Sequence, residues 1–254
     1  IVAATGIDPR AVTRHIRTRG VMMGALSTEH TADELVDIVR ATEGYGAINF
    51  VDQVTTKRPY VFSAAGEVRK KVVLLDCGVK RNILRELAKL GCETTVFPCS
   101  TSASELLESA PDGVLISPGP GDPERLMPIA DTVKELAESG TPMMGICLGH
   151  QVLGRAYGAR TFKLPFGHRG GNHPVKDLTS GRVYITSQNH GYAVDPEGLQ
   201  GSAIEVAHIN LNDGTVEGLR HKDKPVFSIQ YHPEASPGPV DSNYFFHAFM
   251  QSMD

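Results

Sequence analysis

The stretch MMGICLGHQ at residues 143–151 joins a short apolar run to a helical pattern, with a single cysteine at the junction. Residues 143–146 are expected to form a strand and residues 148–157 a helix. Cys147 stands in a G-x-C-x-G pattern, the cysteine version of the sharp strand-to-helix turn called a nucleophile elbow. Such a turn presents its central side chain beyond the carboxyl end of a strand, so the stretch indicates an α/β fold.

The same alternation of short apolar runs and helical runs extends outward from this stretch. Before it, we expect strands at 72–76, 94–97 and 113–116, with helices at 82–90, at a run capped by Ser102 and Glu105, and within 123–139. After it, we expect strands at 182–187, 204–209, 216–220 and 226–230, and a last helix at 243–250. This spacing predicts βαβ units, hence an open, mostly parallel sheet flanked by helices.

Residues 1–62 have a different texture from the rest of the chain. They contain a short basic helix predicted at 9–20 and a helix at 31–41 that opens with a capping box at Thr31 and Glu34. A small, polar stretch follows, which suits a linker at residues 63–69. We therefore expect a small, partial N-terminal domain before an α/β domain at residues 70–254.

Composition excludes several classes of protein. The 25 Lys and Arg against 29 Asp and Glu give a formal net charge of −4, whereas a dedicated nucleic-acid or membrane-surface binder would carry a basic face. No apolar stretch approaches the roughly 20 residues that cross a bilayer, and no secretory pattern is present. The 4 cysteines are irregularly spaced, which favours reduced thiols. We expect a cytoplasmic protein without nucleic-acid or membrane partners.

Cys147 is the candidate nucleophile, because a helix N-terminus stabilises the thiolate form of a cysteine. A thiol nucleophile needs a base and a group that orients the base. His232 and Glu234, in a His-Pro-Glu run after an expected strand, offer both. His150 competes as the base, since it lies one helical turn after the cysteine. Spacing leaves the two histidines open, although only His232 arrives with a carboxylate.

The loop SPGPGDP at residues 117–123 is a second candidate element of the site. Two glycines braced by three prolines form a rigid loop whose amide N–H groups are free to face a developing oxyanion. A turn-rich connector and a phosphate cradle are the alternatives, but a P-loop needs a Gly-Lys-Ser/Thr ending that this loop lacks.

Several motifs together resemble a known family. The runs at 145–151 and 232–234 resemble the class I, triad-type glutamine amidotransferases. A closer resemblance, to the small glutamine-hydrolysing subunits of carbamoyl-phosphate synthase, extends over essentially the whole chain. The runs that carry it are KRNILR at 80–85, FGHRGGNHPV at 166–175, QNHGYAV at 188–194 and PEASPGP at 233–239.

The resemblance implies roles for particular residues. Cys147 would be the nucleophile, His232 the general acid and base, and Glu234 its orienter. The amides of Gly119 and Leu148 would form the oxyanion hole, while Gln151 and a loop at 189–192 would hold the amino-acid head group of L-glutamine. The implied glutamine-binding residues are Gly119, Gly121, Leu148, Gln151, Asn189, Gly191 and Tyr192. By spacing alone, residues 189–191 would be a plain turn.

The resemblance also implies a partner. Ammonia would pass to a large subunit that makes carbamoyl phosphate from bicarbonate, with ATP and Mg²⁺ bound by that partner and no cofactor on this chain. Pro118 stands where the family more often has Asn. In having a proline at this position the chain resembles the anthranilate synthase amidotransferases, but these enzymes lack the segment at 166–174. There are therefore two alternatives. The chain could be the amidotransferase subunit of another synthase, similar to anthranilate synthase, or an inactive interaction subunit.

A further departure limits what the resemblance implies. Residues 1–62 resemble only the last part of a longer β-rich N-terminal domain, so a serine that the family supplies from the earlier part has no counterpart here.

The set of His168, His173 and His190 could suggest a metal. We expect no metal site, because no carboxylate or cysteine completes the set at the usual ligand spacing.

Overall fold

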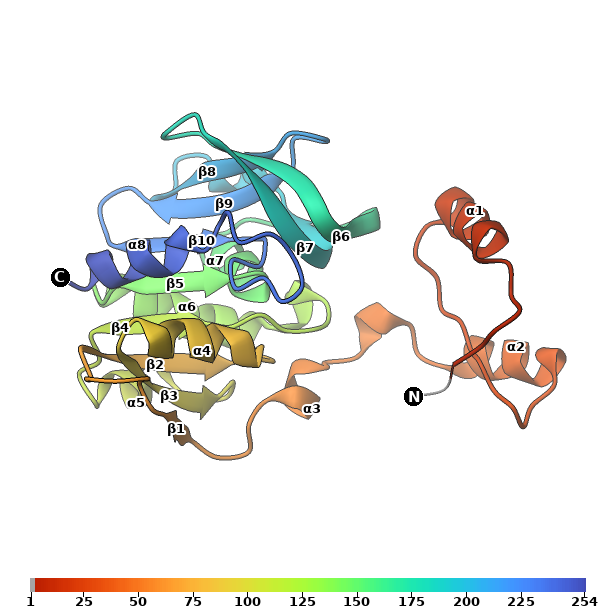
Figure 1. Cartoon of the computed structure of the whole chain (residues 1–254), viewed down its shortest axis with the longest axis horizontal. Helices are drawn as coiled ribbons and strands as arrows, with labels where there is room; N and C mark the ends of the chain where they lie inside the picture. The colour runs from red at the N-terminus through yellow and green to blue at the C-terminus, as the bar shows by residue number, and fades with distance from the viewer. Residues whose placement is uncertain (1–2) are drawn as a thin grey trace.

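The protein, described by a computed structural model over residues 3–254, contains one large sheet (Figure 1). Its strands are β1 (Tyr60–Phe62), β2 (Lys70–Asp76), β3 (Cys92–Pro98), β4 (Gly113–Ile116), β5 (Met143–Ile146), β6 (Thr161–Asp177), β7 (Val183–Val194), β8 (Ile204–Asn210), β9 (Val216–His221) and β10 (Val226–Ile229). They are hydrogen-bonded in the order β1-β3-β2-β4-β5-β10-β9-β8-β6-β7. Ile1 and Val2 lie outside the described residues.

The helices are α1 (Pro9–Arg19), α2 (Ala32–Ala41), α3 (Val51–Val54), α4 (Arg81–Lys89), α5 (Ala103–Leu107), α6 (Met127–Glu138), α7 (Leu148–Ala156) and α8 (Tyr244–Ser252). Three short 3₁₀ turns are η1 (Tyr45–Ala47), η2 (Pro123–Arg125) and η3 (Pro196–Leu199). In Figure 1, α4 and α8 lie in front of the sheet while α6 and α7 lie behind it. The expected α/β class, with helices flanking an open sheet, is confirmed.

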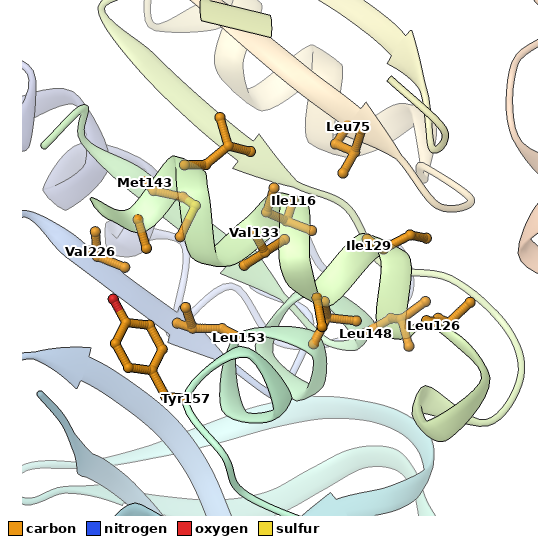
Figure 2. Close-up of a cluster of buried hydrophobic side chains, with 14 of the residues drawn as sticks. Leu75, Ile116, Leu126, Ile129, Val133, Met143, Leu148, Leu153, Tyr157 and Val226 are labelled. Carbon is orange, nitrogen blue, oxygen red and sulfur yellow. The ribbon is translucent and has the colours of Figure 1, made fainter. Parts of the chain in front are cut away.

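The five strands β3, β2, β4, β5 and β10 are parallel to one another and form what we call the parallel half. Successive residues of β2 point to opposite faces: Val73 and Leu75 belong to the core beneath α5, α6 and α7, and Val72 and Leu74 to the core beneath α4 and α8. Figure 2 shows part of the first core, which gathers Leu75 of β2 with Ile116 of β4 and with side chains of α6 and α7. Burial on both faces explains why β2, β4 and β5 read as continuous apolar runs.

The strands β9, β8, β6 and β7 continue the sheet with antiparallel pairing, and we call them the antiparallel half. The 17-residue strand β6 was not among the expected strands. Its Pro and Gly residues erase the alternating pattern, and the pairing with β7 shifts register between Lys163 and His168 and again between Gly170 and His173. β7 was predicted only over 182–187. The turn or loop expected at residues 189–192 is wrong, because these residues lie inside β7, where Asn189, His190 and Tyr192 pair with β6.

The N-terminal helices agree with the sequence prediction. α2 begins with the capping box of Thr31 and Glu34, and α1 has no buried residue. Both lie to one side of the sheet in Figure 1. β1 pairs with β3 at the sheet edge, and residues 63–69 carry no helix or strand. The division into domains at 62 and 70 stays a prediction. Across residues 3–254, no helix is long and apolar enough to span a membrane.

Candidate active site

Cys147 lies at the sharp turn between β5 and α7. Its φ of 53° and ψ of −100° are strained for a residue with a side chain, and its amide donates to the Ile229 carbonyl at 2.8 Å. The flanking glycines permit the close approach of helix and sheet. A Cβ at position 149 would lie 2.4 Å from the Ile116 carbonyl oxygen, and one at 145 would lie 2.8 Å from the Gly149 oxygen. The expected elbow is therefore present, at the carboxyl edge of the parallel half.

His232 and Glu234 follow β10, the strand next to β5. The imidazole Nδ1 lies 2.8 Å from Glu234 Oε1, and Lys80 Nζ lies 3.1 Å from the same oxygen. Asn82 fixes the backbone by donating its side-chain amide to the Glu234 carbonyl at 2.6 Å. The carboxylate thus orients the ring by its Nδ1 side and leaves Nε2 turned away from Glu234.

The charges of this group depend on one another. Burial disfavours the imidazolium, but the negative charges of Cys147 and Glu234, with hydrogen bonds to both side chains, raise the pKa of His232 to about 10. Burial likewise disfavours the Glu234 carboxylate, and its bond to His232 and the nearby Lys80 outweigh burial and lower its pKa. These contacts favour the protonated form of His232.

His150, the competing base, has a different environment. Its Nδ1 is 3.0 Å from Ser228 Oγ, the residue is fully buried, and burial lowers its pKa to about 3. It lies outside the lining of the cavity described next. Of the two histidines left open by spacing, the structure brings His232 to the cavity of Cys147 and keeps His150 in the core.

A cavity of about 570 Å³ collects most of the sequence-predicted site residues. Eight of the ten line it: Gly119, Gly121, Cys147, Gln151, Asn189, Gly191, Tyr192 and His232. The other two do not. Glu234 lies behind His232, and the side chain of Leu148 packs in the core beneath α6 and α7. This volume is in the usual range for small-molecule sites.

The loop at 117–123 connects β4 to η2 and forms one wall. A Cβ at Gly119 would lie 2.2 Å from the Cys77 carbonyl oxygen, so only glycine fits where the loop passes this strand end. Leu148 is the first residue of α7, and amides of a first helical turn have no acceptor within the helix. The positions expected to form an oxyanion hole therefore lie next to Cys147 in the chain and in the cavity wall.

Residues of β7 also contribute to the cavity wall. Asn189, Gly191 and Tyr192 line the cavity, and Gln151 of α7 donates its side-chain amide to the Tyr192 carbonyl at 2.8 Å. Burial, and then the nearby Asp122, raise the pKa of Tyr192 to about 12, so its phenol is neutral.

Sequence reasoning missed several cavity residues. Tyr45 accepts a hydrogen bond from the Gly121 amide at 3.0 Å, and Lys163 and Arg169 come from the unexpected strand β6. Lys80 lies in the family-like run at 80–85, which could have drawn attention to it. No sequence pattern indicates Tyr45, which lies on a different segment from every motif.

A second polar cluster lies in the antiparallel half. Glu217 Oε1 is 3.3 Å from His168 Nδ1, and the cluster of His168, His190 and Glu217 is compact enough to hold a metal ion. The expectation that no carboxylate joins these histidines is wrong for two of the three, since β9 brings Glu217 to His168 and His190; His173 is not part of this cluster. These side chains already bond within the protein, to Asp213, Gln188, Asn210 and the Tyr192 carbonyl. That no metal binds here stays a prediction.

Comparisons with known proteins agree with this geometry. Residues 73–252 match the family model of class I glutamine amidotransferases. The carbamoyl phosphate synthase small chain of Methanopyrus kandleri is 50% identical over 250 residues, covering 96% of this chain and 68% of the relative. That of Staphylococcus haemolyticus is 50% identical over 254 residues, covering 100% and 68%.

Among solved structures, a protein from Thermoplasma acidophilum, assigned to GMP synthase as one of its subunits, aligns with a TM-score of 0.63 at 22% identity. The match covers 74% of this chain and 96% of that chain, and it bears on the fold. The curated relatives favour the carbamoyl-phosphate synthase interpretation over the anthranilate synthase-like alternative. The chain therefore belongs to the class I glutamine amidotransferases and, within them, to the carbamoyl phosphate synthase small chains.

Proposed function

We propose that Cys147, His232 and Glu234 form the catalytic triad of this glutamine-hydrolysing subunit. The reaction is L-glutamine plus water giving L-glutamate and ammonia. The observation that carries the assignment is the position of the cysteine at the end of β5 and the histidine–carboxylate pair after the adjacent β10, with both reactive side chains lining one cavity. The triad needs a nucleophile, a base and an orienter, and this edge of the sheet supplies all three.

In the first half of the reaction, the Cys147 thiolate attacks the side-chain carbonyl carbon of glutamine. The amides of Gly119 and Leu148 donate to the oxygen that becomes negative in the tetrahedral intermediate. The protonated His232 gives its proton to the leaving nitrogen, so ammonia departs and a γ-glutamyl thioester remains on the cysteine. The elevated pKa of His232 keeps that proton available at neutral pH.

In the second half, His232 is neutral and accepts a proton from water. The resulting hydroxide attacks the thioester carbonyl, the same two amides hold the oxyanion, and glutamate leaves as the thiolate forms again. Glu234 stabilises the imidazolium in both halves of the reaction, because its carboxylate accepts the hydrogen bond from Nδ1 of His232.

The remaining predicted residues bind the substrate. Gly119 and Gly121 shape the wall around the reacting amide, and Leu148 contributes its backbone. Gln151 and the β7 residues Asn189, Gly191 and Tyr192 face the cavity from the other side, where they would hold the amino-acid head group. This arrangement fixes glutamine between the two halves of the sheet.

The ammonia is proposed to pass to an ATP-dependent large subunit that makes carbamoyl phosphate from bicarbonate. Support comes from the names of the relatives, which are small chains of that synthase. ATP and Mg²⁺ are then bound by the large subunit, and this chain uses no cofactor. The complex is expected in the cytoplasm.

The test uses the chain assembled with a large subunit of this synthase. Cys147→Ser should abolish carbamoyl phosphate synthesis from glutamine and leave synthesis from added ammonia, because only the thiol's step is lost. Cys99→Ser is the matched control, since Cys99 is also a buried free thiol but lies outside the cavity lining. Glutamine-driven synthesis that survives in Cys147→Ser would contradict the proposal, and so would an unmutated complex that uses ammonia alone.

A further inference from the structure

Gln230 is a buried polar residue for which the proposed reaction has no use. It directly follows β10 and is fully buried. Its side-chain nitrogen Nε2 lies 3.7 Å from Cys147 Sγ, within the range of an N–H···S hydrogen bond, and its backbone amide donates to the Glu217 carbonyl at 2.8 Å. The nucleophile therefore has an amide neighbour from the strand that also leads to His232.

The orientation of the Gln230 side chain follows from its neighbours. Gln151 Nε2 lies 2.8 Å from the Tyr192 carbonyl oxygen, which can only accept, so the nitrogen assignment of Gln151 is fixed. The same Nε2 lies 3.0 Å from Gln230 Oε1. Gln230 must therefore present its oxygen to Gln151 and its NH₂ group to the sulfur. Turning either amide over would place two donors or two acceptors together.

We propose that Gln230 is a positioning residue for the nucleophile, whose amide donates to Cys147 Sγ, favours the thiolate over the thiol and holds the sulfur toward the cavity. A hydrogen bond is stronger when its acceptor is charged, so the amide stabilises the anion more than the neutral thiol. Gln151 keeps this amide in place and also supports Tyr192 in the substrate wall. Gln151 thus connects the substrate wall to Gln230, and Gln230 contacts the sulfur.

The inference rests on the proposed function, in which Cys147 is the nucleophile. The measurement is made on the sulfur itself: the rate at which iodoacetamide alkylates Cys147 in the full chain, followed by mass spectrometry across pH. Gln230→Met removes the donor and keeps most of the volume. We expect the pH of half-maximal alkylation rate to rise by roughly 0.5–1 unit, a 3- to 10-fold slower reaction below that pH, as for loss of one hydrogen bond to an anion.

Gln230→Glu tests the two ends of the Gln230 side chain separately, because it removes the NH₂ donor to the sulfur and keeps the oxygen that accepts from Gln151. It keeps an oxygen for Gln151 but places a negative charge by the sulfur, so the half-maximal pH should rise further than in Gln230→Met. Gln188→Met is the matched control, because Gln188 is also a buried glutamine, bonded to Glu217 rather than to sulfur. A purely structural role predicts that all three variants lower the melting temperature and none moves the alkylation profile, and that result overturns the inference.

A measurement on the unmutated chain covers the case in which the variants fail to fold. The side-chain amide protons of Gln230, followed by NMR, should change chemical shift at the same pH as the onset of Cys147 alkylation. An amide signal that ignores that pH would overturn the inference. Neither readout needs glutamine hydrolysis, so failure here and failure of the triad, seen as activity surviving in Cys147→Ser, are distinguishable.

Discussion

The two halves of the sheet contribute to the site in different ways. The parallel half places Cys147 and His232 just beyond the ends of adjacent strands, where the backbone turns away and a side chain is left facing the cavity. The antiparallel half contributes Asn189 and Tyr192 from within a paired strand. The halves are joined by the pairing of β10 with β9, and also by the His232 amide, which donates to the Ser187 carbonyl of β7 at 2.9 Å. We therefore expect the first half to govern kcat and the second to govern KM.

The largest effect should come from His232→Asn in the parallel half. Glutamine hydrolysis should fall by roughly 10²- to 10⁴-fold in kcat, the usual contribution of a general acid and base, while ammonia-dependent synthesis in the complex stays intact. His150→Asn is the matched comparison, since His150 is buried and bonded to Ser228. A severe loss in His150→Asn with a mild one in His232→Asn would reverse the assignment of the base.

Glu234→Gln should cost less, roughly 10- to 100-fold in kcat, because the orienting bond to His232 survives without its charge. It should also lower the free energy of unfolding by about 1–3 kcal/mol, in a limited pH window.

The window follows from the two pKa shifts. The pKa of Glu234 is lowered in the folded protein, so its contribution is present above the ordinary value of 4.5 and is lost as pH falls below it. The pKa of His232 is raised from 6.5 to about 10, so its contribution is complete below 6.5 and is lost as pH rises toward 10. Urea unfolding should show the largest difference between wild type and Glu234→Gln between pH 5 and 6.5, roughly the interval where both contributions are present. An equal difference at all pH values would show that the loss is not electrostatic.

The antiparallel half is tested by Asn189→Ala. Removing this cavity-lining amide should raise KM for glutamine roughly 5- to 20-fold with kcat within about 2-fold, because the group is proposed to bind the head group and not the reacting atoms. Asn172→Ala is the control, since Asn172 lies in the same half, on β6, outside the cavity lining. Steady-state glutaminase kinetics measure both. A fall in kcat at unchanged KM in Asn189→Ala would contradict the expectation that the antiparallel half governs KM and not kcat.

The smallest effect is expected from Tyr45→Phe. The hydroxyl that accepts from the Gly121 amide is lost while the ring stays stacked on Phe50. Since Tyr45 is 44% exposed, water can replace its hydroxyl, and KM for glutamine should change by less than about 3-fold. A change in KM as large as that of Asn189→Ala would show that the hydroxyl of Tyr45 contributes to substrate binding as strongly as the β7 residue does.

The parallel half could be predicted from the sequence because its signals are local. The boundaries of β4 and β5, and the elbow at Cys147, follow from apolar runs that end in glycine patterns. The antiparallel half depends on long-range pairing. β6 carries prolines and glycines that hide its strand character, and Glu217 meets His168 only because β8 and β9 pair beside β6.

The contact between Gln230 and Cys147 is of the same long-range kind. The end of a strand could be predicted at Gln230, but its direction toward the sulfur depends on Gln151 and Tyr192. The side chains of Gln151 and Gln230 and the Tyr192 carbonyl come from separate segments, and sequence spacing does not indicate how they are arranged.

The most direct measurement of the central claim is a search for the γ-glutamyl thioester. The unmutated chain and the His232→Asn variant, which lacks the acid of the first half as well as the base of the second, are each mixed with glutamine, quenched in acid during turnover and digested, and their cysteine peptides are weighed. The account predicts one added γ-glutamyl group on the Cys147 peptide and none on those of Cys77, Cys92 and Cys99. Glutamate formed while Cys147 stays unmodified throughout the time course, and formed equally by Cys147→Ala, would contradict it.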